Sequence, residues 1–404
     1  MTVVSARMRQ VKLSPSVAAR IILNQLREEG RRIIDMTIGE PDFATPDHIS
    51  KAAIDAIMRG DTKYPLSQGT VALRKAAALR ISLDTGLEYP LDQIIVSTGA
   101  KQVLYNALTA TLEAGDEVII PAPYWVSYPD MVELSGGVPV TLLTQAASQY
   151  KITPDALRAA ITPKTKWLML NAPSNPSGTV YDLAELAALA DVLRDHPHVW
   201  IMTDDIYARL TFDGGPAPHI LQAAPDLADR TLAVNGVSKC YAMTGWRIGY
   251  GSGPKDLIKA MAVVQSQSTS GACTISQAAA TAALNGPQDC VEDFARSFKE
   301  RRDLALTILA DAPGLNAVSP DGAFYIFPDC SALLGSTAPD GSVIATDADL
   351  VQYILRKTGV ALLDGMSYGV PGTFRLSFAS APDEVREGCE AIKSVCKELA
   401  ENKA

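Results

Sequence analysis

The sequence has no excess of positive charge and no long apolar run. Its 404 residues carry 36 Lys and Arg against 45 Asp and Glu, which gives a formal charge of −9. Nucleic-acid-binding proteins normally present a basic face, so this balance argues against a nucleic-acid partner. No apolar stretch is long enough to span a bilayer, and the first residues lack the apolar block of a secretory signal. We therefore expect no membrane association.

Cysteine and histidine are scarce and scattered. The six cysteines show no C-x-x-C spacing, so we expect free thiols in the cytoplasm instead of disulfides or zinc ligands. None of the four histidines has a metal-type partner at helical spacing, and no metal site is expected. The chain also lacks a G-x-S-x-G segment, which argues against a Ser-His-Asp hydrolase.

Short apolar runs alternate with amphipathic stretches through the middle of the chain. Continuous apolar runs of this length are typical of strands buried on both faces, and the alternation with helices is typical of an open, mostly parallel sheet flanked by helices. The predicted strands lie at residues 93–99, 117–123, 166–173, 199–205 and 231–237, with helices at 101–115, 154–162 and 183–195. The fold class is therefore predicted to be α/β.

The last quarter of the chain has a different pattern. Residues 295–312 form a long charged amphipathic stretch typical of a helix, followed by predicted strands at 322–329 and 373–380 and a closing helix. A chain of this length exceeds one compact core. We predict a large domain over residues 46–290 and a smaller α+β domain built from residues 1–45 and 291–404.

Functional side chains follow the predicted strands where each strand ends. In open α/β sheets, the ligand site lies beyond the carboxyl ends of the strands. Each residue alone is equally well explained as a helix cap or a turn. The combination indicates a site, and its members are Gly99, Ala100 and Lys101; Tyr124 and Trp125; Asn171 and Asn175; Asp204 and Tyr207; Ser238, Lys239 and Arg247.

One chemistry uses all of these parts. Pyridoxal phosphate needs an amine for its aldehyde, an anion site for its phosphate, a stacking aromatic ring and an acid for its ring nitrogen. Lys239 is then the covalent anchor, and Arg247 neutralises the phosphate together with the backbone amides of residues 99–101. The glycines around Lys239 allow the backbone to approach the cofactor closely.

Eight segments of the chain resemble the bacterial aspartate aminotransferases, which are fold-type I pyridoxal-phosphate enzymes. The segments are TIGEPDFATPDHI, TKYPLSQG, STGAKQ, PAPYWVSYPDM, APSNPSGTVY, TDDIYARL, GVSKCYAMTGWRIGY and FRLSFAS. They are spread over nearly the whole chain. The resemblance implies a homodimeric, pyridoxal-phosphate-dependent enzyme that moves the amino group of aspartate or glutamate to a 2-oxo acid, such as 2-oxoglutarate or glyoxylate, by ping-pong chemistry.

The resemblance also implies roles around the cofactor. Lys239 forms the Schiff base and shuttles the proton of the substrate α-carbon. Asp204 faces the pyridine nitrogen, and Tyr207 and Asn175 contact the ring oxygen. Trp125 stacks on the ring, and the tyrosine directly before it is the alternative for this role. Where many relatives have a phosphate-binding serine this chain has a glycine at position 236, so the contact is expected to fall to the serine at position 238.

Substrate and subunit contacts are implied in the same way. Arg375 binds the substrate α-carboxylate with two prongs, and Gly39 offers a backbone group to it. Tyr64 reaches the phosphate of the other subunit. No arginine lies between residues 248 and 295, so the second carboxylate-binding arginine of animal-type enzymes is missing. Lys101, assisted by Ser14, is expected to bind the distal carboxylate, and one ammonium permits relaxed specificity that extends to prephenate or aromatic acids.

Three other functions remain open at this point. A β-eliminating lyase would use the same cofactor. A nicotinamide-dependent oxidoreductase is suggested by Gly249, Gly251 and Gly253, although their spacing departs from G-x-G-x-x-G. A non-enzymatic ligand-binding regulator is the third.

Overall fold

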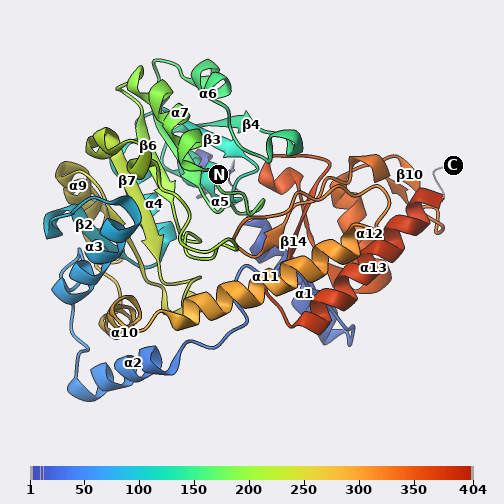
Figure 1. The fold of residues 1–404 in the computed structure, drawn as a ribbon, viewed down its shortest axis with the longest axis horizontal. Coiled ribbons are helices and arrows are strands. Elements are labelled where there is room, and N and C mark those ends of the chain that lie inside the picture. The colour runs from blue at the N-terminus through green and yellow to red at the C-terminus, as the bar shows by residue number, and fades with distance from the viewer. Residues whose placement is uncertain (1–2, 10, 12, 402–404) are drawn as a thin grey trace.

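The computed structural model describes residues 3–9, 11 and 13–401, and a seven-stranded sheet lies at its centre (Figure 1). Neighbouring strands run parallel, except that β8 is antiparallel to both β2 and β7. The strand order is β2 (Ile94–Ser97), β8 (Gly249–Ser252), β7 (Thr231–Gly236), β6 (Trp200–Asp204), β5 (Thr165–Asn171), β3 (Glu117–Ala122) and β4 (Val138–Leu143). The five predicted strands and the mostly parallel open sheet are confirmed.

Both faces of the sheet are buried, which explains why the strands are continuous apolar runs. Along β5, Trp167 and Met169 belong to one core cluster, whereas Leu168 and Leu170 belong to the cluster on the opposite face. Successive strand residues point to opposite faces, so both faces require apolar residues. Helices α4 (Ala100–Thr111), α5 (Ser127–Leu134) and α9 (Lys255–Ser266) contribute to the first cluster, and α6 (Pro154–Ala160), α7 (Leu183–Arg194) and α8 (Ile220–Ala223) to the second.

Strands β4 and β8 were missing from the sequence prediction. β8 is glycine-rich because it lies against the start of α4: a Cβ at Gly249 would collide with the backbone of Ala100. Gly249 and Gly251 thus lie inside a strand, and Gly253 follows it. A nicotinamide-binding glycine cluster would instead form a turn from strand to helix. Gly249 and Gly251 allow this strand to pack against α4, and Gly253 lies against Thr231 and Leu232 of β7.

The N- and C-terminal parts of the chain pack together beside the large sheet. β1 (Ile34–Asp35) pairs in parallel with β12 (Val360–Ala361), and β14 (Phe374–Ser377) lies between β13 (Leu363–Asp364) and β9 (Tyr325–Ile326). A short hairpin joins β10 (Ser336–Thr337) and β11 (Val343–Ile344). The predicted strands at 322–329 and 373–380 are therefore present, although shorter than expected.

The remaining helices surround these sheets. The long α11 runs from the side of the large sheet to α12 and α13 (Figure 1), and it begins six residues earlier than its sequence pattern. The helices are α1 (Pro15–Glu28), α2 (Asp47–Arg59), α3 (Val71–Thr85), α10 (Thr274–Asn285), α11 (Asp289–Leu309), α12 (Asp347–Thr358) and α13 (Pro382–Glu401). Within the described part of the chain, no helix is long and apolar enough to cross a membrane. All six cysteines are described and free, as predicted.

Candidate active site

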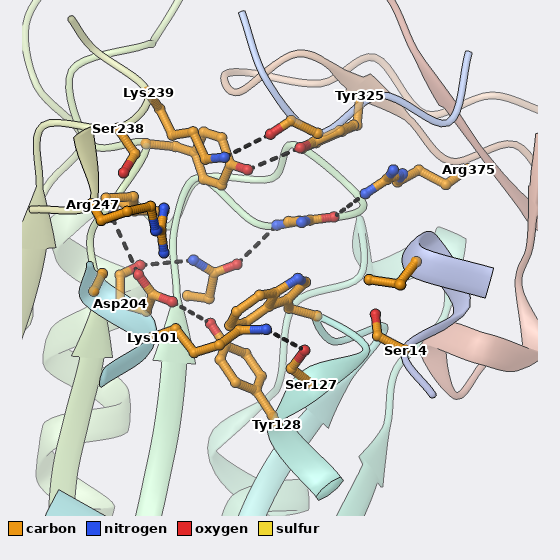
Figure 2. Close-up of a pocket in the computed structure, with 18 residues that line it drawn as sticks. Ser14, Lys101, Ser127, Tyr128, Asp204, Ser238, Lys239, Arg247, Tyr325 and Arg375 are labelled. Carbon is orange, nitrogen blue, oxygen red and sulfur yellow. Dashed lines mark hydrogen bonds between the residues drawn. The ribbon is translucent and has the colours of Figure 1, made fainter. Parts of the chain in front are cut away.

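A cavity of about 310 Å³ lies beyond the carboxyl ends of the parallel strands, and Figure 2 shows the 18 residues that line it. In that view Lys239, Asp204 and Arg247 lie along one side, with Arg375 and Ser14 along the other. Thirteen of the residues predicted from the sequence line it: Ser14, Gly39, Ala100, Lys101, Trp125, Asn171, Asn175, Asp204, Tyr207, Ser238, Lys239, Arg247 and Arg375. The sheet edge thus brings together residues from every predicted strand end.

Three predicted residues, Gly99, Tyr64 and Tyr124, do not line the cavity. Gly99 lies just behind it, and a Cβ at that position would be 2.5 Å from Nη2 of Arg247. Tyr64 is 94% exposed in the single chain, so its predicted contact with a second subunit stays a prediction. Trp125 lines the cavity, whereas its neighbour Tyr124 lies against Gly369, so of these two aromatic residues it is Trp125 that faces the site.

Lys239 follows the end of β7, and its Nζ donates a hydrogen bond to the carbonyl oxygen of Gly39 at 2.6 Å. Burial lowers the pKa of Lys239 to about 8, because removal from water disfavours the charged form. The positive charges of Arg247 and Arg375 lower the pKa further, and Glu40 opposes them. The amine is therefore largely free at mildly alkaline pH, as a nucleophile requires.

Asp204 ends β6 and is only 5% exposed. Burial raises the pKa of Asp204 to about 6, and the hydroxyl of Tyr128, which donates to Oδ2 at 2.7 Å, opposes this rise. A buried carboxyl with a perturbed pKa in a cavity is typical of a functional site. It stays ionised at neutral pH and can accept a hydrogen bond from a protonated ring nitrogen.

A series of hydrogen bonds connects Asp204 to Arg375 on the opposite side of the cavity. Nδ2 of Asn171 donates to the backbone oxygen of Asp204 at 2.7 Å, and Oδ1 of Asn171 accepts from the backbone nitrogen of Asn175 at 2.8 Å. Oδ1 of Asn175 in turn accepts from Nη1 of Arg375 at 3.1 Å. The loop after β5 thereby fixes the spacing between the acid and the guanidinium.

Arg375 lies on β14 and is 2% exposed. Its Nη2 donates to the carbonyl oxygen of Thr37 at 2.6 Å, and its guanidinium carbon lies 4.4 Å from the ring centre of Tyr325. Nε has no hydrogen-bond partner in the structure, and none of the described Asp or Glu residues forms an ion pair with this arginine. A buried guanidinium without a carboxylate is costly on its own and prepared for an anionic ligand.

Lys101 lies in the first turn of α4. Its Nζ donates to Oγ of Ser127 at 3.1 Å and lies 4.5 Å from the ring centre of Trp125. Burial and the nearby Arg247 lower the pKa of Lys101, and Asp130 opposes them. This ammonium therefore lines the cavity, although the lysine as a whole remains exposed to solvent in the single chain.

The start of α4 and Arg247 lie together at a position suited to an anion. α4 begins after Gly99 without a side-chain cap, which leaves its first amides available. Arg247 has a φ of +56°, and its Nη1 donates to the carbonyl of Thr244 at 2.8 Å. Ser238 lines the same part of the cavity. A Cβ at position 236 would lie 3.0 Å from the carbonyl oxygen of Ile248, which leaves little room for a serine there.

A sequence model of the family described as aminotransferase class I and II matches residues 31–392. The chain belongs to this family. It is 49% identical over 375 residues to the aspartate aminotransferase of Rhizobium meliloti (93% of this chain, 92% of the relative), and 48% identical over 400 residues to the aspartate/prephenate aminotransferase of Cereibacter sphaeroides (99% and 100%).

Solved structures give the same family. The crystal structure of the Rhizobium meliloti aspartate aminotransferase matches with a TM-score of 0.95 at 46% identity, over 99% of this chain and 100% of that one. The Thermus thermophilus aspartate aminotransferase with maleate matches with a TM-score of 0.90 at 39% identity, over 98% and 100%. The resemblance found in the sequence and the fold-type I architecture are confirmed, and the chain is an aminotransferase.

Three polar side chains at this aminotransferase site escaped the sequence prediction, as did the apolar Val17 and Ile206. Ser127 contacts Lys101, Tyr128 contacts Asp204, and the hydroxyl of Tyr325 lies 2.9 Å from that of Tyr207. Ser127 and Tyr128 follow the aromatic loop directly, so their proximity to it was the available signal. Tyr325 lies within an apolar strand and carries no comparable signal.

Proposed function

We propose that this aminotransferase carries pyridoxal 5′-phosphate on Lys239 and moves the amino group of aspartate or glutamate to a 2-oxo acid, such as 2-oxoglutarate or glyoxylate, by ping-pong chemistry. One observation carries the proposal: the half-buried amine of Lys239 lines one cavity with the buried guanidinium of Arg375, which has no carboxylate partner among the described residues. An amine attaches an aldehyde, and a guanidinium binds an α-carboxylate in two-pronged fashion.

The cavity residues fit pyridoxal phosphate part by part. The first amides of α4, Ser238 and Arg247 suit a phosphate group, and the space at Gly99 exists because that residue has no Cβ. Trp125 offers a flat face for a ring. Asp204 is an acid suited to a ring nitrogen, and its burial protects that contact from competition by water.

The cofactor, when bound, supplies an electron sink for the electrons left after the substrate α-carbon loses its proton. Lys239 then takes that proton on Nζ and returns it, and its pKa of about 8 suits both roles near neutral pH. Asp204 holds a proton on the ring nitrogen. Tyr207, whose pKa burial holds well above its usual range, stays protonated and donates to the ring oxygen together with Asn175.

The proposed substrate contacts use two of the cationic side chains that line the cavity, Arg375 and Lys101. Arg375 and the backbone of Gly39 bind the α-carboxylate, and Lys101 with Ser14 binds the distal carboxylate. A single ammonium is less demanding in geometry than a guanidinium fork, so longer or aromatic acids remain acceptable. Prephenate, or an aromatic 2-oxo acid, is a second acceptor, and the name of the Cereibacter sphaeroides relative supports prephenate.

The active unit is a homodimer in the cytoplasm. Ile54, Ile57 and Met58 form an exposed apolar stripe at helical spacing on α2, and Tyr64 and Leu66 lie exposed in the loop that follows. Uncovered apolar patches mark interfaces. A second copy that covers this face brings Tyr64 to the phosphate group of the partner site.

The chain divides into a large cofactor-binding domain, residues 46–290, and a small domain, residues 1–45 and 291–404. Pairing of β1 with β12 supports the assignment of the N-terminal segment to the small domain. The boundary after residue 290 falls in the first turn of α11. Lys239 and Arg375 then belong to different domains, so closure of one on the other brings them together around a substrate.

Steady-state kinetics with aspartate and each of three acceptors test this function. The acceptors are 2-oxoglutarate, glyoxylate and prephenate; oxaloacetate is tested with glutamate as the donor, because aspartate itself gives oxaloacetate. Parallel lines in double-reciprocal plots are expected, because the amino group resides on the enzyme between two half-reactions. Intersecting lines, or release of ammonia without an aminated product, would contradict a transaminase.

The Lys101→Ala variant tests the distal-carboxylate contact in the same assay. Turnover of aspartate is expected to fall far more than turnover of alanine or phenylalanine, since only aspartate has the second carboxylate. Lys63→Ala, which removes an exposed lysine outside the cavity, is the control. Equal losses with all three donors would assign Lys101 to cofactor support alone.

A further inference from the structure

We propose that Tyr128 is a positioning residue that fixes one oxygen of the Asp204 carboxylate and leaves the other for the ring nitrogen of the cofactor. The proposal rests on the proposed function, because it assumes a pyridine ring in the cavity. Oη of Tyr128 donates to Oδ2 of Asp204 at 2.7 Å, and the two residues are 3% and 5% exposed (Figure 2).

The two carboxylate oxygens of Asp204 have unequal partners. Oδ2 accepts the short bond from the tyrosine hydroxyl. From the part of the chain that the structure describes, Oδ1 receives only a long contact of 3.4 Å, from the backbone nitrogen of Ile206. A carboxylate oxygen has capacity for two hydrogen bonds, so Oδ1 retains room for a strong donor. The tyrosine thereby selects which oxygen faces the ring.

The short segment from Trp125 to Tyr128 connects Asp204 to the indole ring that lines the site. Tyr128 lies in the first turn of α5, and its backbone nitrogen donates to the carbonyl of Trp125 at 3.0 Å. The two rings meet edge to face, with centres 5.4 Å apart and an angle of 87° between planes. Any shift of the stacking residue is therefore transmitted to the hydroxyl that holds Asp204.

The hydrogen bond from Tyr128 opposes the effects that raise the pKa of Asp204. Burial raises the pKa of the carboxyl, and the neighbouring Asp205 adds to the rise. The hydrogen bond from Tyr128 is the largest opposing effect, ahead of the positive charge of Lys239. Burial also holds the pKa of Tyr128 well above its usual range, so the phenol stays a donor. The phenol of Tyr207 is likewise protonated.

The first test is an infrared titration of the carboxyl groups in cofactor-free protein. The Asp204 signal is assigned by its loss in Asp204→Asn. Tyr128→Phe removes only the hydroxyl, and we expect the Asp204 midpoint to rise by roughly one pH unit, a tenfold change in the acid dissociation constant. Tyr353→Phe is the matched control, because Tyr353 donates to Oε1 of Glu398 at the same 2.7 Å on α12. An unchanged midpoint in Tyr128→Phe would overturn the proposal.

The second test measures cofactor affinity by quenching of tryptophan fluorescence. Tyr128→Phe is expected to raise the Kd for pyridoxal phosphate roughly tenfold, and Tyr353→Phe to leave it unchanged. A wild-type Kd retained in Tyr128→Phe would refute the positioning role alone. Wild-type protein that fails to bind pyridoxal phosphate would refute the proposed function, and the role of Tyr128 with it.

A third variant covers the case in which loss of the hydroxyl prevents folding. 3-Fluorotyrosine incorporated at position 128 keeps the hydroxyl and makes it a stronger donor. The Asp204 midpoint is then expected to fall. A midpoint that stays at the wild-type value would contradict the proposal independently of Tyr128→Phe.

Discussion

At the scale of single residues, burial moves the pKa values of two oppositely charged side chains toward neutral pH. The pKa of Lys239 falls to about 8 and that of Asp204 rises to about 6, and both side chains line the same cavity. Asp204 is ionised above pH 6, whereas the amine of Lys239 becomes free as the pH rises through 8. The same desolvation therefore prepares an acid partner for a ring nitrogen and a nucleophile for an aldehyde.

This pair predicts the pH dependence of cofactor attachment. The rate at which pyridoxal phosphate attaches to cofactor-free protein should rise with pH and reach half of its maximum near pH 8, because only the free amine reacts. Stopped-flow absorbance measures this rate. A half-maximum near the ordinary lysine pKa of 10.5 would mean that Lys239 is not held in a desolvated site.

Arg375 gives a second prediction at this scale. Arg375→Lys keeps the charge and loses the two-pronged geometry, so kcat/KM should fall for every amino-acid donor by about 2–5 kcal/mol in transition-state stabilisation. Arg386→Lys, an exposed change on α13, is the control. Similar kcat/KM values in wild-type protein and Arg375→Lys would remove Arg375 from the substrate site.

At the scale of elements, the start of α4 depends on the absence of a side chain at Gly99. The residue has a φ of +88°, and a Cβ there would approach Arg247. Gly99→Ala should weaken binding of pyridoxal phosphate by at least roughly tenfold, since it displaces the guanidinium and distorts the anion site. Equilibrium dialysis measures this affinity.

Gly86→Ala is the control for backbone strain alone. Gly86 ends α3 with a φ of +77°, and nothing lies within 4 Å of its missing Cβ. It should lose about 1–2 kcal/mol of stability and no cofactor affinity. Equal losses of affinity in the two variants would show that the anion site is not formed at Gly99.

Sequence patterns predicted strands well where both faces of the strand are buried. The five doubly buried strands were readable as apolar runs, and their ends placed the site. β4 was missed because it is an edge strand with exposed Val138 and Leu143, and β8 because its glycines replace apolar residues. Tyr325 escaped because its role arises from the pairing of β9 with β14, which no local pattern reveals.

At the scale of the whole molecule, the uncovered stripe on α2 predicts a dimer. Met58, the most exposed member of the stripe, is 81% exposed, and Met58→Glu should yield a monomer in sedimentation velocity, because it introduces a charge into the proposed interface. That monomer should also lose pyridoxal phosphate more readily, since Tyr64 no longer reaches the partner site. Leu143→Glu, on the edge strand β4, should remain dimeric. A dimeric Met58→Glu protein would place the interface elsewhere.

The absorption spectrum of the purified protein with pyridoxal phosphate tests the central claim most directly. Wild-type protein should develop a yellow band that aspartate or glutamate bleaches and a 2-oxo acid restores, and Lys239→Ala should give no such cycle. Lys255→Ala, at the exposed start of α9, should behave as wild type. Protein that stays colourless, or a Lys239→Ala variant that still completes the cycle, would contradict the assignment of Lys239 as the cofactor-bearing residue of this aminotransferase.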